Sequence, residues 1–203
     1  MKIRTLLLYS SGGTSRDIFL QTYLGPLLKK IQGSKLLTNG IKNEQYQRLL
    51  YSLISPYEAL SYINDWKEAF ENSDELDVTS LNILNQRHAH SYLQKHIKEF
   101  DLIILMHSVL GDNVEIIIPF EQVLKERTGK LLSFVGNEYD LMLKKKAFLQ
   151  NVDADYIASQ LPHEAHTFAY KELSAQLIDA PHALNENIYC PSKKNKVYDI
   201  VFT

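Results

Sequence analysis

The sequence has little cysteine, no long apolar run and no strong excess of charge. Its single cysteine, Cys190, excludes an intramolecular disulfide and is typical of a protein from a reducing compartment. No apolar run approaches the roughly 20 residues that a membrane-spanning helix needs. The 22 basic and 24 acidic residues leave a formal net charge of −2, which gives no reason to expect a nucleic acid as partner. We therefore expect a cytoplasmic protein.

What the sequence does contain is an alternation of apolar runs with stretches of helical periodicity. It predicts strands at 3–9, 76–81, 101–106, 130–135, 156–158 and 175–178, and helices over 16–31, 56–70, 83–100, 120–127, 141–150 and after Pro162. The run 101–106 is apolar on both faces, as a central parallel strand is. Such alternation with short connections predicts an α/β fold with a doubly wound, mostly parallel, Rossmann-like sheet.

Ligands on such sheets bind at the carboxyl ends of the strands, which selects the loops 10–15, 107–113, 136–139, 159–163 and 180–187. His107 ends the clearest strand, where an imidazole can orient a hydroxyl or stabilise developing charge on a phosphate. The alternative is a histidine satisfied by nearby backbone, and its position favours function. Glu138 follows the next strand at the same edge, as either a binding residue or an exposed, solvated carboxylate.

The polar loop 10–15 (Ser-Ser-Gly-Gly-Thr-Ser) lies between the first strand and its helix. Backbone N–H groups and a positive helix end favour an anion at this position. The loop lacks both the three-glycine dinucleotide spacing and the lysine of a P-loop. A tight turn that needs glycine for a positive φ is an equally supported interpretation.

Three further motifs are interpreted as structural. The segment 153–155 (Asp-Ala-Asp) matches a metal-binding pattern of one class of sugar transferases, but it precedes a strand, so we expect a turn at the opposite sheet edge. The segment 163–166 (His-Glu-Ala-His) departs from H-E-x-x-H by one position, so zinc is not expected. The run 144–146 (Lys-Lys-Lys) is interpreted as a solvated helix face, with a peripheral membrane or phosphate contact as the less common alternative.

The C-terminal segment carries a resemblance to a known family. Residues 197–203 (Val-Tyr-Asp-Ile-Val-Phe-Thr) have the composition of a strand and follow a turn-like stretch over 190–196. They resemble the strand that opens the second Rossmann-like domain of GT-B glycosyltransferases in the group 1 and CgeB-like families. Residues 180–185 (Ala-Pro-His-Ala-Leu-Asn) resemble the stretch before the interdomain linker. The 10–15 loop and His107 resemble the family's N-terminal glycine loop and its histidine after a central strand.

The resemblance implies one half of a GT-B architecture. Residues 1–190 would form the N-terminal acceptor-side domain, and 191–203 the linker and first strand of a C-terminal donor-binding domain. The whole enzyme would move a sugar from a nucleotide-sugar co-substrate to a hydroxyl of a glycan, lipid or protein, without a required metal or other cofactor. The candidate residues are His107 for catalysis and, for substrate binding, Gly12, Gly13, Thr14, Glu138 and His182.

Two other interpretations of the sequence stay open. One is a self-contained flavodoxin-like or nucleotide-binding α/β protein, in which the loop containing Gly12 and Gly13 holds a phosphate. The other is a non-enzymatic α/β interaction module, in which His107 has no catalytic role.

Overall fold

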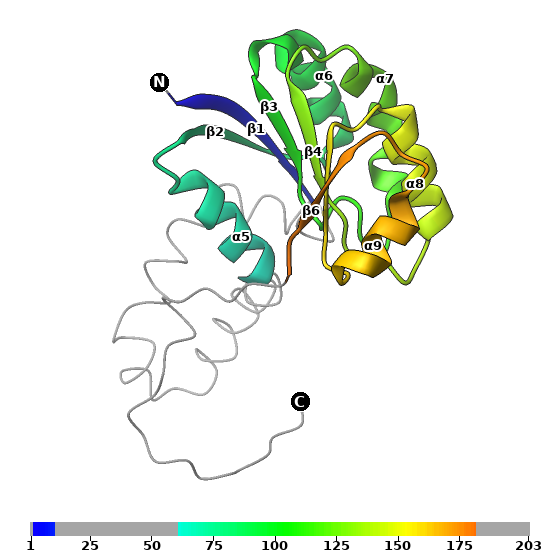
Figure 1. Cartoon of the computed structure of the whole chain (residues 1–203). Helices are drawn as coiled ribbons and strands as arrows, with labels where there is room; N and C mark the ends of the chain where they lie inside the picture. Colours follow the sequence, from blue (N-terminus) through cyan, green and yellow to red (C-terminus); the bar gives the residue numbers. More distant parts are fainter. Residues whose placement is uncertain (1, 11–60, 182–203) are drawn as a thin grey trace, which may run out of the picture.

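The computed structural model describes residues 2–10 and 61–181, which form a six-stranded sheet (Figure 1). Every neighbouring pair of strands is parallel, which confirms the predicted α/β class. The strands lie in the order β2-β1-β3-β4-β5-β6. Their bounds are β1 (Ile3–Tyr9), β2 (Leu76–Asn82), β3 (Leu102–Leu105), β4 (Lys130–Phe134), β5 (Tyr156–Ser159) and β6 (Gln176–Asp179).

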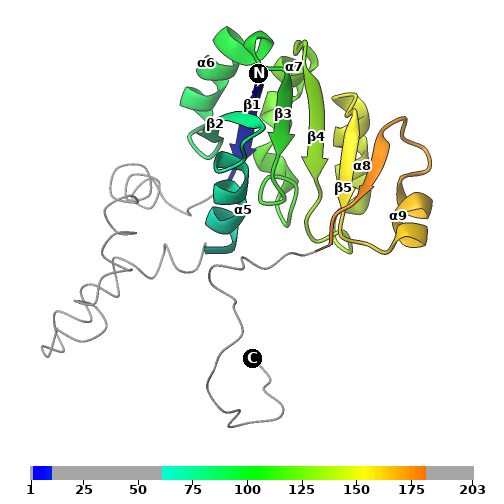
Figure 2. The same cartoon turned by 60° about the vertical axis from the view of Figure 1, so that its left-hand side comes forward.

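The direction in which strands are added to the sheet reverses at β1. From β1 the chain adds β2 on one side, and it then returns to place β3, β4, β5 and β6 successively on the other side. The boundary between β1 and β3 is therefore the topological switch point, where open α/β sheets bind ligands beyond the carboxyl ends of their strands. Figure 2 shows these ends at a common edge of the sheet.

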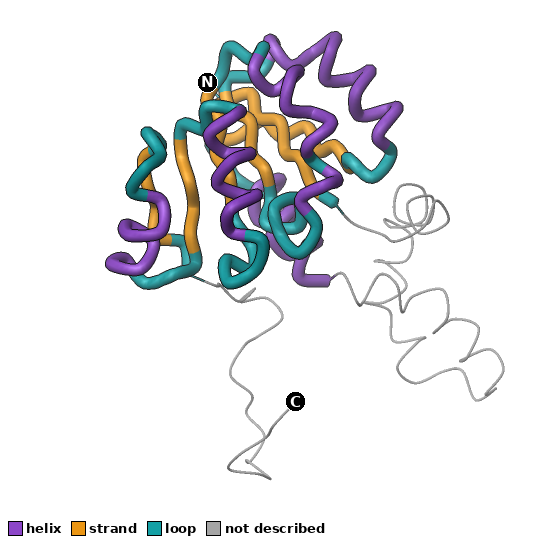
Figure 3. The backbone as a smooth tube through the Cα atoms, turned by 90° about the vertical axis from the view of Figure 1, so that its right-hand side faces the viewer, coloured by secondary structure: helices purple, strands orange, loops and turns teal. Residues whose placement is uncertain are grey.

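Helices cover both faces of the sheet, so the predicted double winding is confirmed. The face seen in Figure 3 carries α6 (Gln86–His96), α7 (Glu121–Lys125), α8 (Met142–Asn151) and α9 (His163–Tyr170). Among the described elements, α5 (Ser61–Glu71) covers the opposite face.

The strand side chains divide between the two faces with a period of two. Leu6 and Leu8 of β1 belong to the core beneath α6–α9, while Leu7 packs against α5. All three leucines are fully buried, and such a side chain contributes about 1.5–3 kcal/mol of burial free energy. Burial on both faces makes β1 one of the central strands that flank the switch point.

Helix boundaries follow local capping. α6 begins three residues later than predicted because the Asn85 side chain accepts a hydrogen bond from the backbone N–H of His88, at 3.3 Å. It ends in a 3₁₀ turn, Ile97–Glu99, before β3. Two more 3₁₀ turns, Val114–Ile116 and Ile118–Phe120, lie between the predicted 107–113 loop and α7.

Several predictions fall outside the described residues. They include the helix over 16–31, the first residues of the helix predicted over 56–70 and the strand at 197–203, together with the proposed domain boundary at 190. Within residues 2–10 and 61–181, no helix combines the length and apolar composition needed to cross a membrane.

Candidate functional site

The predicted loops do gather at one edge of the sheet. Residues 107–113, 136–139 and 159–163 leave the carboxyl ends of β3, β4 and β5, which run in the same direction. Ser10 and Ala180 occupy the corresponding positions after β1 and β6. Residues 11–15 and 182–187 of these loops lie outside the described residues, and with them the candidate residues Gly12, Gly13, Thr14 and His182.

At the switch point, the side chain of Ser108, in the loop after β3, bonds to the residue that follows β1. Ser108 Oγ accepts a hydrogen bond from the backbone N–H of Ser10 at 3.1 Å, which joins the exits of β1 and β3. His107, the adjacent residue, is partly exposed, and its ring lies 5.7 Å, edge-on, from that of Trp66 in α5. Trp66 in turn packs edge-on against Phe134 of β4 at 5.3 Å. The structure therefore places the predicted catalytic histidine at the switch point, between the sheet and α5.

The backbone of His107 is held by two glycines. A Cβ atom on Gly136 would lie 2.9 Å from the carbonyl oxygen of His107, and one on Gly111 would lie 3.1 Å from it. Gly136 also donates its N–H to the carbonyl of Leu110 at 3.2 Å. A side chain at position 136 would force a shift of the backbone, and one at position 111 would be tightly packed, so glycine at these positions lets the exit loops of β3 and β4 pack closely together. This packing fixes the position from which the imidazole projects.

Glu138 is buried in a hydrogen-bond network, so its interpretation as an exposed, solvated carboxylate is wrong. Only 7% of the residue is exposed. Its Oε1 accepts from the hydroxyls of Ser159 at 2.8 Å and Tyr170 at 2.6 Å, and its Oε2 accepts from the backbone N–H of Gln160 at 3.0 Å. We call these four residues the Glu138 network. Its bonds run to β5 and α9, away from the switch point.

The network also changes the acidity of its tyrosine. Burial, followed by the hydrogen bond to Glu138 and by its negative charge, raises the pKa of Tyr170 far above the usual range. The Tyr170 hydroxyl therefore stays protonated, as donation to a carboxylate requires. The sequence gives no sign of this partnership, because its members come from three separate segments.

Lys145 is fully buried, so the prediction of a solvated face for the 144–146 run is wrong at its middle residue. Its ammonium donates to the carbonyls of Gly136 at 2.7 Å and Asn137 at 2.8 Å. Burial lowers the pKa of Lys145, and attraction by Asp140 and two further carboxylates opposes that shift.

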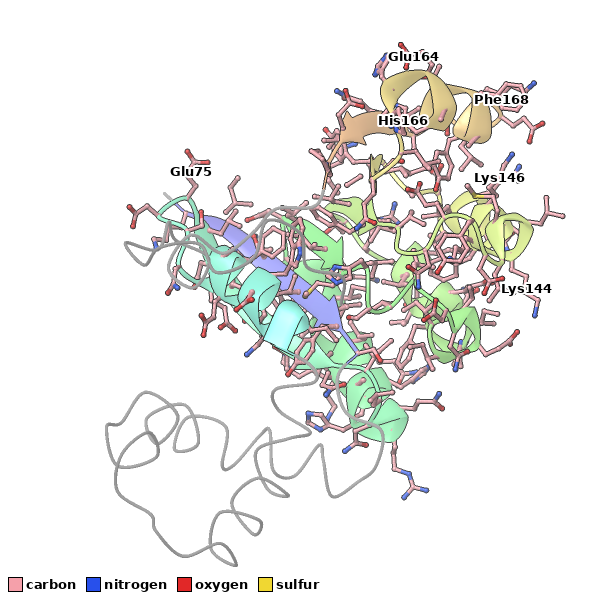
Figure 4. All side chains as sticks on the ribbon, turned by 90° about the horizontal axis from the view of Figure 1, so that it is seen from below. Glu75, Lys144, Lys146, Glu164, His166 and Phe168 are labelled. Carbon is pink, nitrogen blue, oxygen red and sulfur yellow. The ribbon has the colours of Figure 1, made fainter. Side chains whose placement is uncertain are left out.

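Of the two flanking lysines of the run, Lys144 is exposed and Lys146 is partly exposed. Lys144 and Lys146 project from the outer side of α8 (Figure 4), where they pair with Glu115 and Glu172, each at 2.8 Å. A signal for the buried position was present in the sequence. Lys145 precedes Phe148, Leu149 and Val152 at the i+3, i+4 and i+7 spacing of an apolar helix face.

The remaining motifs, 153–155 and 163–166, lie at opposite edges of the sheet. Asp153 lies in the turn before β5 with a φ of 51°, and Asp155 accepts hydrogen bonds from Lys130 at 2.6 Å and from Arg127 at 3.2 Å. This is the amino edge, as expected. His163 and His166 lie at the carboxyl edge, where the end of β6 brings a carboxylate beside them.

Comparisons of the chain with protein-family models, with curated proteins and with solved structures gave no match. A function is therefore inferred from the chain's own residues and their geometry.

Tyr9, which ends β1 at the switch point, predicts a loss of stability at alkaline pH. Burial, followed by the negative charge of Glu71, raises its pKa to about 12. An unfolded tyrosine titrates near pH 10, so between pH 10 and 12 the unfolded chain releases a proton that the folded chain retains. The folded state is then destabilised as the pH rises, by about 1.4 kcal/mol from this group at pH 11.

Between pH 8 and pH 11 the free energy of urea unfolding should fall by about 1.4 kcal/mol less for Tyr9→Phe than for wild type. Tyr139→Phe provides the control, because Tyr139 is 87% exposed and should leave the pH dependence unchanged. Equal losses in wild type and Tyr9→Phe would contradict the assignment.

Proposed function

We propose that this chain is the N-terminal, acceptor-side domain of a GT-B glycosyltransferase, and that the full-length protein transfers a sugar from a nucleotide-sugar donor to a hydroxyl acceptor. The observation that carries the proposal is the position of His107, at the carboxyl end of a central strand beside the switch point. The sequence resemblance at 180–185 and 198–203 supplies the reaction class.

The surroundings of His107 suit a group that handles protons. It is partly exposed, its ring contacts Trp66, and its backbone is held by Gly136 and Gly111. In the proposed reaction the neutral imidazole accepts the proton of the attacking hydroxyl, or the protonated form stabilises charge on the departing phosphate. A fixed backbone favours either role, because proton transfer requires the heavy atoms to be within hydrogen-bond distance.

The test is nucleoside diphosphate release by the full-length protein, measured over a panel of nucleotide sugars and hydroxyl acceptors. We expect His107→Ala to reduce turnover on the order of 100-fold, the usual scale for a lost acid or base. His96→Ala is the matched control, because His96 ends α6 and pairs with the exposed Glu99 at 3.0 Å. Wild-type turnover by His107→Ala would contradict the proposal, as would measurable turnover by residues 1–203 alone.

One observation favours a second candidate, a self-contained flavin- or nucleotide-binding protein. The order β2-β1-β3-β4-β5 is that of flavodoxin-like sheets, which bind a phosphate-bearing ligand at the β1/β3 boundary. Trp66 is the sole tryptophan of the chain and contacts His107, so its fluorescence reports on this boundary. Saturable quenching of Trp66 by a flavin mononucleotide or a nucleoside diphosphate, together with no transferase activity, would favour the second candidate.

A further inference from the structure

Two histidines and an aspartate meet at the outer end of the sheet. His163 and His166 are the first and fourth residues of α9, and this spacing places them on one face of the helix. Asp179 is the last residue of β6, the edge strand beside β5. The segment 163–166 departs from H-E-x-x-H by one position, and Asp179 lies too far along the chain for a local motif to include it.

Two of the three distances between these groups match those of a metal site. His163 Nδ1 lies 3.3 Å from Asp179 Oδ2, and His166 Nε2 lies 3.2 Å from Asp179 Oδ1. One ligand atom from each residue lies within 4.8 Å of those of the other two. Bond lengths of about 2.0–2.2 Å to a tetrahedral Zn²⁺ separate neighbouring ligand atoms by about 3.3 Å.

His166 provides an independent reason to place a ligand here. The residue is completely buried, yet neither ring nitrogen makes a hydrogen bond within the described part of the chain. Its Nε2 is close to the Asp179 carboxylate without hydrogen-bonding geometry. Burial of an imidazole nitrogen without a partner is costly, and a metal ion bound to Nε2 would remove that cost. Figure 4 shows the placement of His166 on α9.

We propose that His163, His166 and Asp179 bind a divalent transition-metal ion, with Zn²⁺ as the best match. Two imidazoles and one carboxylate suit the late first-row ions, and three protein ligands leave a fourth tetrahedral position for water. The bound ion holds the first turn of α9 against the end of β6. β6 lies three strands from β3, or about 14 Å at the usual strand spacing, so the metal site is separate from the switch point.

The experiment uses the whole chain, purified without a polyhistidine tag and freed of metal by chelation. We expect Co²⁺ to give the visible absorption bands of a tetrahedral complex. We also expect Zn²⁺ at a hundredfold excess over its dissociation constant to raise Tm by about 5–10 °C. His163→Ala and Asp179→Ala should each abolish both effects. Their side chains are 69% and 58% exposed, so these variants should keep the fold, whereas His166 is buried.

His96→Ala is the matched control, because this histidine also pairs with a carboxylate but belongs to no three-residue cluster in the described ranges. It should keep the full metal response. Absence of the Co²⁺ bands and of a Zn²⁺ shift in the wild-type chain would overturn the proposal. A full response in the double variant His163→Ala/Asp179→Ala would also overturn it, because the ion would then be bound elsewhere.

Discussion

Replacement of Glu138 by alanine should destabilise the fold by about 3–5 kcal/mol, a large part of the 5–15 kcal/mol that holds a typical domain together. The variant leaves three donors without their acceptor: the hydroxyls of Ser159 and Tyr170 and the N–H of Gln160. Each unpaired buried donor costs about 1–3 kcal/mol, and relief from burying the carboxylate offsets part of the sum. Urea unfolding at pH 7 measures the difference.

The control for this prediction is Glu115→Ala, which removes an exposed carboxylate paired with Lys144 and should cost less than about 0.5 kcal/mol. Tyr170→Phe should cost about 1.5–3 kcal/mol, the contribution of a hydrogen bond to a charged group. Because Glu138 and Tyr170 are in contact, the double variant should be less destabilised than the sum of the two single variants. A loss below 1 kcal/mol for Glu138→Ala would show that the network is not a structural unit.

The hydrogen bonds of Glu138 change the role that the sequence suggests for this residue. The sequence predicts it as a substrate-binding residue because it follows a strand at the ligand-binding edge. In the structure its hydrogen bonds link the exits of β4 and β5 with α9, which gives it a structural task. A substrate contact stays a prediction, and activity of a Glu138 variant is informative only at temperatures where that variant is folded.

The fold was predictable because its signals are local. The central strands β1 and β3 are short apolar runs, and α6 has its N-cap residue, Asn85, within its own segment. Parallel order and a common carboxyl edge follow from the alternation alone. His107 could therefore be placed at that edge from the single feature that it follows the most apolar strand.

The contacts that build the site were not predictable in the same way, because each joins distant segments. Asp179 lies 13 residues beyond His166, and Tyr170 reaches back to Glu138 across 32 positions. No sequence-spacing rule predicts that a residue of a helix will contact the last residue of the strand that follows it. The burial of Lys145 is an exception, because the apolar residues three, four and seven positions after it indicate a buried helix face, although a run of three lysines by itself indicates an exposed one.

Replacement of Lys145 by methionine should cost about 2–3 kcal/mol, because the buried carbonyl of Gly136 and the partly buried carbonyl of Asn137 lose their donor. Methionine keeps the length and apolar character of the side chain, so packing against the core changes little. Lys144→Met is the matched control on the preceding residue; its side chain is 59% exposed, and the change should stay within about 0.5 kcal/mol. Urea unfolding of the three proteins at pH 7 gives the comparison.

The pH dependence of this difference in stability distinguishes the loss of a buried charge from a change in packing. Burial lowers the pKa of Lys145, so from that pKa up to about 10.5 the unfolded chain binds more protons at this residue than the folded chain does. The contribution of Lys145 to stability therefore increases as the pH rises through this window, and the gap between wild type and Lys145→Met should be wider at pH 10.5 than at pH 7.

The Lys145→Met variant should also change the surroundings of His107. Lys145 holds the 136–137 backbone, and Gly136 supports the carbonyl of His107, whose ring contacts Trp66. Loss of the lysine should therefore shift the fluorescence of Trp66 in the folded protein, while Lys144→Met leaves it unchanged. An unaltered Trp66 spectrum in a destabilised Lys145→Met would show that His107 is held independently of α8, by Gly111 and the strand itself.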